Sequence, residues 1–228
     1  MPPQITDARA LDANRSVVAG RIALVGLAVA ALVLLTVAVE MDAWPVRLDH
    51  WITGLLPAPG AGGLDGVLMA SAWIVATLAT PAVTVALTLV AGAWWSWGEQ
   101  STAPLRSVLP PVMVMTIAVV TGKALLHRAG PPGSKTPHLL GYYPSGHTAT
   151  ALVCTATLAV LAGQRHPGWA TRLRVASSCW TVLVAIAMVF HRYHWLTDVV
   201  AAGLLGAVIV MSFPHRPVST SGQPACRG

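Results

Sequence analysis

Charged residues are scarce in this sequence of 228 residues. Asp, Glu, Lys and Arg together make up 10% of it, whereas hydrophobic residues make up 55%. A soluble globular domain usually carries about 25% charged residues. The shortage of charge therefore argues against an ordinary soluble domain, and it predicts an integral membrane protein.

Cysteine is scarce too. Of the three cysteines, Cys154 and Cys179 fall within apolar segments, and Cys226 lies near the C-terminus. No Cys or His spacing in the sequence matches a zinc-binding pattern. We therefore expect no disulfide, no metal site and no cofactor, and we interpret the cysteines of the apolar segments as small buried thiols.

Long apolar segments dominate the rest of the sequence. A bilayer core about 30 Å thick takes about 20 helical residues to cross. The candidate segments are 17–39, 66–97, 107–126, 147–162, 175–190 and 196–213. We predict an all-α fold, a polytopic membrane helical bundle of about six transmembrane helices. This membrane domain fills residues 17–213, between cytoplasmic tails at 1–16 and 214–228.

Two smaller features refine the predicted bundle. Segment 66–97 is too long for one straight crossing, and Thr80 and Pro81 interrupt it. Because proline breaks a helix, we interpret this segment as an interfacial helix that turns into a transmembrane one. In the last segment, Gly203 and Ala207 are four residues apart, which predicts close helix packing at these small residues.

The distribution of Lys and Arg predicts the orientation. With a cytoplasmic N-terminus, the inside segments hold nine of the 14 basic residues: Arg9, Arg15, Arg21, Arg106, Arg165, Arg172, Arg174, Arg216 and Arg227. The positive-inside rule then places both termini in the cytoplasm. We attribute the net charge of +6 to the basic residues that set the orientation in the membrane and contact anionic lipids, and not to nucleic-acid binding. The high Ala, Val, Leu and Arg content suggests a bacterial plasma membrane.

Three polar clusters lie at ends of the apolar segments. They are Lys123 with residues 128–131, Pro-Ser-Gly-His at 144–147, and His-Trp-Leu-Thr-Asp at 194–198. In the predicted topology, all of these segment ends lie on the outer face. We therefore predict one composite site, with Lys123 supplying a positive charge that lipid alone would disfavour at that depth.

The residue types in these clusters suit chemistry on a phosphate. Ser145 can cap the helix that follows it, and Gly146 lets the backbone approach a ligand closely. Free amides at a helix start favour an anion, and His147 beside them can protonate a leaving oxygen. His194 and Asp198 are four residues apart, so the carboxylate can orient the imidazole as a nucleophile toward phosphorus.

These motifs resemble those of the type 2 phosphatidic acid phosphatase (PAP2) family of lipid phosphatases, whose superfamily includes vanadium haloperoxidases and glucose-6-phosphatase. The resemblance covers about residues 66–213. It implies a PAP2/haloperoxidase-like core and metal-independent hydrolysis of a phosphomonoester or pyrophosphate through a phosphohistidine. The implied roles are nucleophile for His194, orienting partner for Asp198, general acid for His147, and phosphate ligands for Lys123, Ser145 and the Gly146 amide.

The sequence departs from the family pattern at two arginines. The first motif has Arg where this sequence has Gly130, and the third motif has a Ser-Arg pair where it has Ala187 and Met188. Losing such a donor costs on the order of 3 kcal/mol, about a hundredfold in rate. In one interpretation, Arg128 and Arg192 bind the phosphate instead. In another, the protein binds a phosphorylated lipid without efficient turnover.

We expect the partners to be the bilayer itself and a phosphorylated lipid reached from the outer leaflet. Phosphatidic acid, phosphatidylglycerol phosphate, and a polyprenyl phosphate or diphosphate all fit, and no residue distinguishes among their chains. A transporter or structural membrane protein is a third alternative. It is disfavoured because the clusters lie at segment ends on one side, not at broken helices near the bilayer midplane. The sequence carries no signal for an oligomeric state.

Overall fold

The computed structural model describes residues 5–57, 62–134 and 140–213, with side chains from residue 15 onward. Its helices are α1 (Ile5–Glu40), α2 (Trp44–Leu55), α3 (Gly63–Leu78), α4 (Pro81–Gly98), α5 (Ala103–Leu126), α6 (Gly146–Arg165), α7 (Ala170–Phe190) and α8 (Leu196–Ser212), with a short 3-10 helix, η1 (Pro167–Trp169), before α7. No strand occurs in this described part of the chain. The predicted all-α fold is confirmed.

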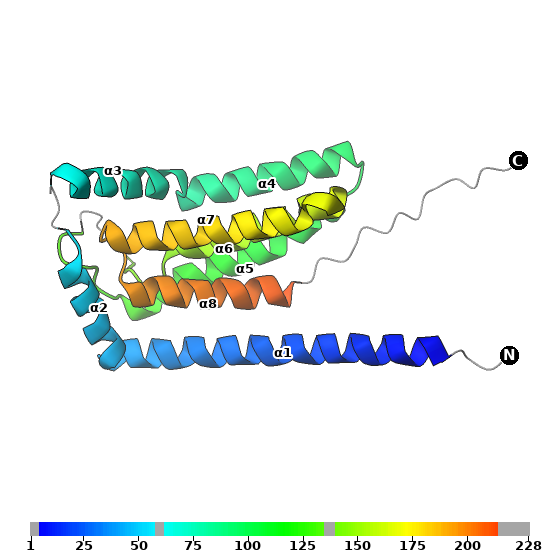
Figure 1. Ribbon diagram of the computed structural model, residues 1–228, viewed down its shortest axis with the longest axis horizontal. Helices are drawn as coiled ribbons and strands as arrows, with labels where there is room; N and C mark the ends of the chain where they lie inside the picture. The colour runs from blue at the N-terminus through cyan, green and yellow to red at the C-terminus, as the bar shows by residue number, and fades with distance from the viewer. Residues whose placement is uncertain (1–4, 58–61, 135–139, 214–228) are drawn as a thin grey trace, which may run out of the picture.

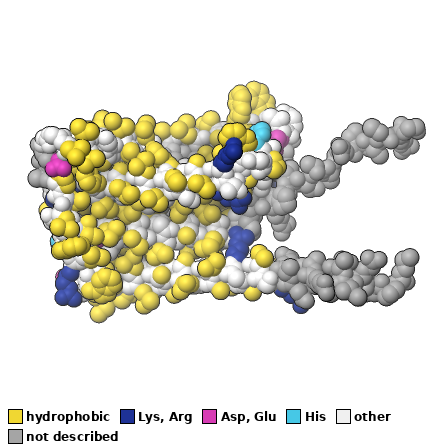
Figure 2. All heavy atoms as spheres, in the orientation of Figure 1, with side chains coloured by type: hydrophobic (Ala, Val, Ile, Leu, Met, Phe, Trp, Pro, Cys, Tyr) yellow, Lys and Arg dark blue, Asp and Glu magenta, His cyan; other side chains and the backbone are white. Residues whose placement is uncertain are grey.

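The long helices run side by side, and α2 crosses one end of the bundle (Figure 1). Helix α6 is central, because it packs against α4, α5, α7 and α8, while α1 packs on α8 and α3 packs on α7. Hydrophobic side chains cover most of the visible face, and charged side chains gather toward its two ends (Figure 2). This distribution suits a bundle whose middle is surrounded by lipid.

The helix lengths support a multi-pass membrane protein. Four segments are long and apolar enough to cross a membrane alone, namely Arg15–Glu40, Ala103–Leu126, Gly146–Arg165 and Pro167–Phe190. Helices α3 and α4 together make a fifth candidate. Helix α8 is apolar but has only 17 residues. The exact count of six crossings therefore stays a prediction.

The structure corrects the predicted position of the interfacial helix. The break at Thr80 and Pro81 is present, since α3 ends at Leu78, α4 begins at Pro81, and the two helices bend by 43°. However, α3 lies along α7 and not across the bundle (Figure 1). The helix that crosses the end is α2. This helix is not among the predicted apolar segments, because it is amphipathic and, with 12 residues, too short to span a bilayer.

Helices α5, α6 and α8 enclose the main hydrophobic core, formed by Val108, Val112, Met115, Val119, Ala149, Val153, Cys154, Leu161, Ala202 and Ile209. Helices α6 and α8 approach closely at Gly206, where an added Cβ would lie 2.6 Å from the Leu152 side chain. An added Cβ at Gly203 would have no atom within 4 Å. The prediction of Gly203 is therefore wrong, because the helices meet one turn further along α8.

We expect Gly206→Leu to lower the free energy of unfolding by about 1–3 kcal/mol, because the new side chain would overlap Leu152. Gly203→Leu is the matched control, and it should leave stability unchanged because the space around it is open. Thermal unfolding of the detergent-purified variants, followed by circular dichroism, measures both effects. Equal destabilisation by the two substitutions would contradict this packing contact.

Candidate active site

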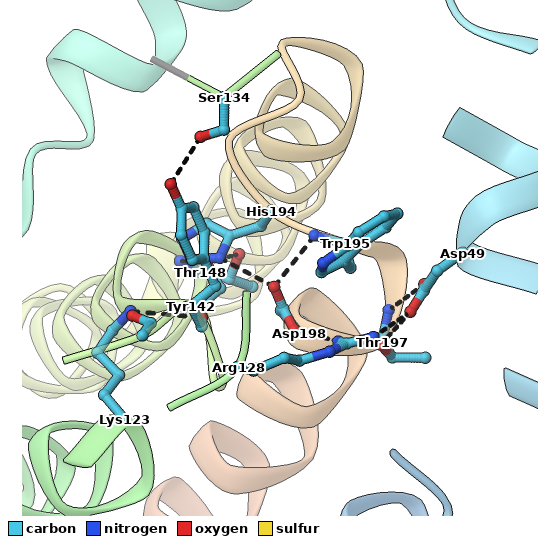
Figure 3. Close-up of polar contacts among 12 residues, drawn as sticks. Asp49, Lys123, Arg128, Ser134, Tyr142, Thr148, His194, Trp195, Thr197 and Asp198 are labelled. Atoms are coloured by element: carbon cyan, nitrogen blue, oxygen red, sulfur yellow. Dashed lines mark hydrogen bonds and ion pairs between the residues drawn. The ribbon is translucent and has the colours of Figure 1, made fainter. Parts of the chain in front are cut away.

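All three predicted polar clusters lie at the end of the bundle that α2 crosses (Figures 1 and 3). Lys123 lies in the last turn of α5, Ser145 caps α6, and Asp198 lies in the first turn of α8. The Ser145 amide donates a 3.0 Å hydrogen bond to the Asp198 carbonyl oxygen. The ring centroids of His147 and His194 lie 6.5 Å apart. The fold thus joins clusters that are distant in sequence.

His194 and Asp198 form a buried pair. Nδ1 of His194 lies 3.2 Å from Oδ2 of Asp198, and the Trp195 amide donates to the same oxygen at 3.1 Å. Burial lowers the pKa of the His194 imidazole, and the hydrogen bond and negative charge of Asp198 act in the opposite direction. The net shift is downward, so the environment favours the neutral form of the ring. A neutral ring can act as a nucleophile through Nε2, on the side away from the carboxylate.

The start of α6 is built as a helix cap. Oγ of Ser145 accepts the Thr148 amide at 3.4 Å and the Thr148 hydroxyl at 3.2 Å, and Ser145 is fully buried. Gly146 is the first helical residue, and the half-buried His147 follows it. The first amides of a helix, together with its dipole, favour an anion at this position.

Lys123 is held against the segment that precedes α6. Its Nζ donates to the carbonyl oxygens of Gly141, at 2.9 Å, and Tyr142, at 3.3 Å. The backbone of Tyr142 also hydrogen-bonds to the His194 ring, and its own ring lies edge-on to that imidazole with centroids 5.8 Å apart. Lys123 and the His194 ring therefore both contact the backbone of Tyr142, and the third N–H group of Lys123 can donate to a phosphate oxygen.

The two positions of the missing motif arginines are closely packed against neighbouring side chains. At Gly130, an added Cβ would lie 2.3 Å from Cζ of Tyr142. Tyr142 is only 8% exposed, and Ser134 fixes its hydroxyl by a 2.8 Å hydrogen bond, so the ring has little freedom to move aside. Met188, at the other position, packs in a hydrophobic cluster that includes Val184.

Arg128 lies within the site, but its guanidinium points to carboxylates (Figure 3). Nη2 donates to Oδ2 of Asp49 at 2.7 Å, and Nη1 donates to the Thr197 hydroxyl at 2.6 Å and to Oδ1 of Asp198. Thr197 donates to Asp49 from its amide at 3.0 Å and from its hydroxyl at 2.5 Å. A contact between Arg128 and phosphate would require some of these bonds to break.

Arg192 lies in the loop between α7 and α8, where its backbone adopts a left-handed conformation with φ of 58°. Its Nη2 donates to the carbonyl oxygens of Leu56, at 2.9 Å, and Pro57, at 3.3 Å. These bonds join the loop before His194 to the end of α2. A role of Arg192 in binding phosphate stays a prediction.

Reasoning from the sequence misses Asp49 and Tyr142, and it gives no role to Thr197, although Thr197 lies in the third polar cluster. Asp49 does carry a signal, because it shares the buried face of α2 with Val46 and Thr53. A lone carboxylate on such a face needs a buried partner. Thr197 and Tyr142 carry no comparable signal, since their contacts depend on residues that only the fold brings opposite them.

The groups gathered at this end of the bundle suit an anion. They are the Lys123 ammonium, the imidazoles of His147 and His194, and the amides at the start of α6. Within the described ranges, no three His, Cys, Asp or Glu side chains are grouped so that they could hold a metal ion. A phosphate group matches this set of nitrogen donors in charge and hydrogen bonding.

Comparison with known proteins shows similarities of sequence and fold. Residues 112–218 match the family model of the PAP2 superfamily. A lipid A 1-phosphatase of Porphyromonas gingivalis is 29% identical over 114 residues, which cover 50% of this chain and 23% of that protein, so the matched region is about a quarter of its length. The crystal structure of a transmembrane PAP2 type phosphatidylglycerolphosphate phosphatase from Bacillus subtilis has a similar fold, with a TM-score of 0.71 and 18% identity over 83% of this chain and 93% of that one. These comparisons support a likeness of this chain to the PAP2 superfamily, whose model matches just under half of it.

Proposed function

We propose that this protein is a phosphatase that hydrolyses a phosphomonoester or diphosphate group of a membrane lipid. The observation that carries the proposal is the meeting of Lys123, the start of α6 and the buried His194–Asp198 pair at one end of an apolar bundle. The matched relatives add support, since one is a lipid A 1-phosphatase and the other a phosphatidylglycerolphosphate phosphatase.

In the first proposed step, Nε2 of His194 attacks the phosphorus atom. The N–P bond forms while the bond from phosphorus to the leaving oxygen breaks, and His147 donates a proton to that oxygen. Asp198 accepts the Nδ1–H hydrogen bond and stabilises the positive charge that develops on the ring. The products of this step are a phosphohistidine and the dephosphorylated lipid, or the lipid monophosphate when the substrate is a diphosphate.

In the second step, water attacks the phosphohistidine. His147, now neutral, accepts a proton from the water, the N–P bond breaks, and its electron pair returns to His194. Lys123, the Ser145 side chain and the Gly146 amide stabilise the non-bridging oxygens in both steps. Two N–H groups of Lys123 are held by the Gly141 and Tyr142 carbonyls, and the third can donate to a phosphate oxygen.

An apolar groove beside the phosphate site suits the chain of a lipid substrate. It lies between α4, α5 and α6, has a volume of about 260 Å³, and reaches from Gly146 along Val119 and Met115. Under the positive-inside rule, the site end of the bundle faces the outside of a bacterial plasma membrane. A lipid of the outer leaflet could then place its phosphate at His194 while its chain stays in the apolar groove.

A second candidate function is binding of a phosphorylated lipid without turnover. It is favoured by the two missing motif arginines, together with the existing bonds of Arg128 to carboxylates and of Arg192 to backbone carbonyls. We prefer the phosphatase because the proposed nucleophile, its aspartate and the proposed acid are all present in one site.

Purified protein should release inorganic phosphate from at least one lipid in a panel of phosphatidic acid, phosphatidylglycerol phosphate and polyprenyl phosphates, in detergent with chelator present. His194→Ala should abolish release because it removes the nucleophile, whereas His166→Ala, at the far end of α6, is the matched control and should retain it. Folded protein that binds these lipids but releases no phosphate from any of them would favour the second candidate function.

Restoring the first motif arginine alone should not improve the enzyme. We expect Gly130→Arg to lower phosphate release on the order of tenfold, because the new side chain would overlap the buried Tyr142 ring, an overpacking cost of about 1–3 kcal/mol. Adding Tyr142→Ala removes the overlap, so the double variant should be more active than Gly130→Arg. A gain of activity in Gly130→Arg itself would show that the ring does not exclude a side chain there.

A further inference from the structure

We propose that Asp49, on α2, is a positioning residue that acts through Arg128 on Asp198 and thereby on His194. The proposal rests on the proposed phosphatase function and extends its site to a helix outside the predicted motifs. Asp49 also lies outside residues 112–218, which match the superfamily model. Neither the three polar clusters nor the family motifs include this carboxylate.

The carboxylate of Asp49 is fully buried, and donors surround it. Oδ1 accepts the Thr197 amide at 3.0 Å, and Oδ2 accepts the Thr197 hydroxyl at 2.5 Å and Nη2 of Arg128 at 2.7 Å. A buried carboxylate is costly unless such partners satisfy it. Asp49 therefore fixes the orientation of the Arg128 guanidinium, and it does so from a helix that supplies none of the proposed reacting groups.

Arg128 transmits this orientation to Asp198. Its planar guanidinium offers one nitrogen to each carboxylate, Nη2 to Asp49 and Nη1 to Oδ1 of Asp198. With Oδ1 held in this way, Oδ2 faces Nδ1 of His194. A rotation of the Asp198 carboxylate would break both contacts. The fork geometry of arginine makes this alignment possible, and a lysine ammonium could not reproduce it.

The charges around His194 support the same role. The charged groups that act on its ring directly are Asp198 on α8 and Lys123 on α5. Arg128, before α6, contacts Asp198 on the side away from the ring, and Asp49 lies behind Arg128. Tyr142, before α6, and His147, on α6, are the other titratable side chains close to the ring. Two carboxylates thus balance two basic groups when the ring is neutral. Without Asp49, one basic charge would be unbalanced, and a cationic ring would be less stable.

Steady-state kinetics of a double-mutant cycle test the connection. Asp49→Asn places an amide N–H against a donor, so we expect kcat to fall on the order of tenfold to a hundredfold while KM changes little. Arg128→Gln should have a similar effect, and the double variant should be no slower than the slower single variant. Asp65→Asn, which neutralises an exposed carboxylate in the first turn of α3, is the matched control and should behave as wild type.

Arg128→Lys separates positioning from phosphate binding. If Arg128 positions Asp198, lysine should lower kcat as strongly as glutamine, because it cannot hold two carboxylates at once. An Arg128→Lys variant with wild-type kcat, or one in which only KM rises, would overturn the proposal. A rise in KM alone would indicate that Arg128 binds the phosphate instead. Independent, multiplicative effects of Asp49→Asn and Arg128→Gln would overturn it as well.

A readout without turnover keeps this test separate from that of the phosphatase itself. In ¹⁵N-histidine NMR, with the His194 signal assigned through His194→Gln, Asp49→Asn should move the titration midpoint of His194 to lower pH. Asp65→Asn should not. If Asp49→Asn does not fold, Thr197→Val removes the hydroxyl between Arg128 and Asp49 at nearly constant volume, and we expect it to lower kcat and to move the midpoint in the same direction. An unchanged midpoint in the folded variant would contradict the proposal, whether or not the wild-type protein hydrolyses any lipid of the panel.

Discussion

The buried carboxylate of Asp198 is the group on which the rest of this site depends. Removing a carboxylate from water costs several kcal/mol, so its oxygens need partners. One oxygen accepts Arg128, and the other accepts the Trp195 amide and faces His194. The backbone carbonyl of the same residue accepts the Ser145 amide. A single residue therefore fixes the start of α8, the start of α6 and the segment after α5 relative to one another.

The membrane bundle and the polar site support each other. Apolar side chains around the helices leave polar groups few places other than the helix ends, and the topology brings several of these ends together (Figures 1 and 2). Helix α2 then covers that end and contributes Asp49 to the interior. Exclusion of water strengthens the electrostatic interactions among these groups, which is a requirement for stabilising charge on phosphate.

Patterns that depend on local sequence were predictable, and contacts that depend on the fold were not. The length of the apolar segments predicted the helical bundle, and the ends of these segments predicted which polar clusters would meet. The amphipathic helix α2 was not predicted, because it is too short to stand out as an apolar segment. Asp49, which lies on this helix, was therefore not predicted either. Arg128 was assigned to phosphate by its closeness in sequence to Gly130, whereas in space it lies between two carboxylates.

The most direct test of the central claim is detection of the phosphohistidine. Brief incubation of the purified protein with a lipid carrying ³²P-phosphate, followed by a rapid alkaline quench, should leave label that is stable in base and labile in acid. Peptide mapping should place that label on His194, and His147→Ala should slow its removal. Phosphate release with no label on His194, or undiminished label in His194→Ala, would contradict a mechanism through this residue.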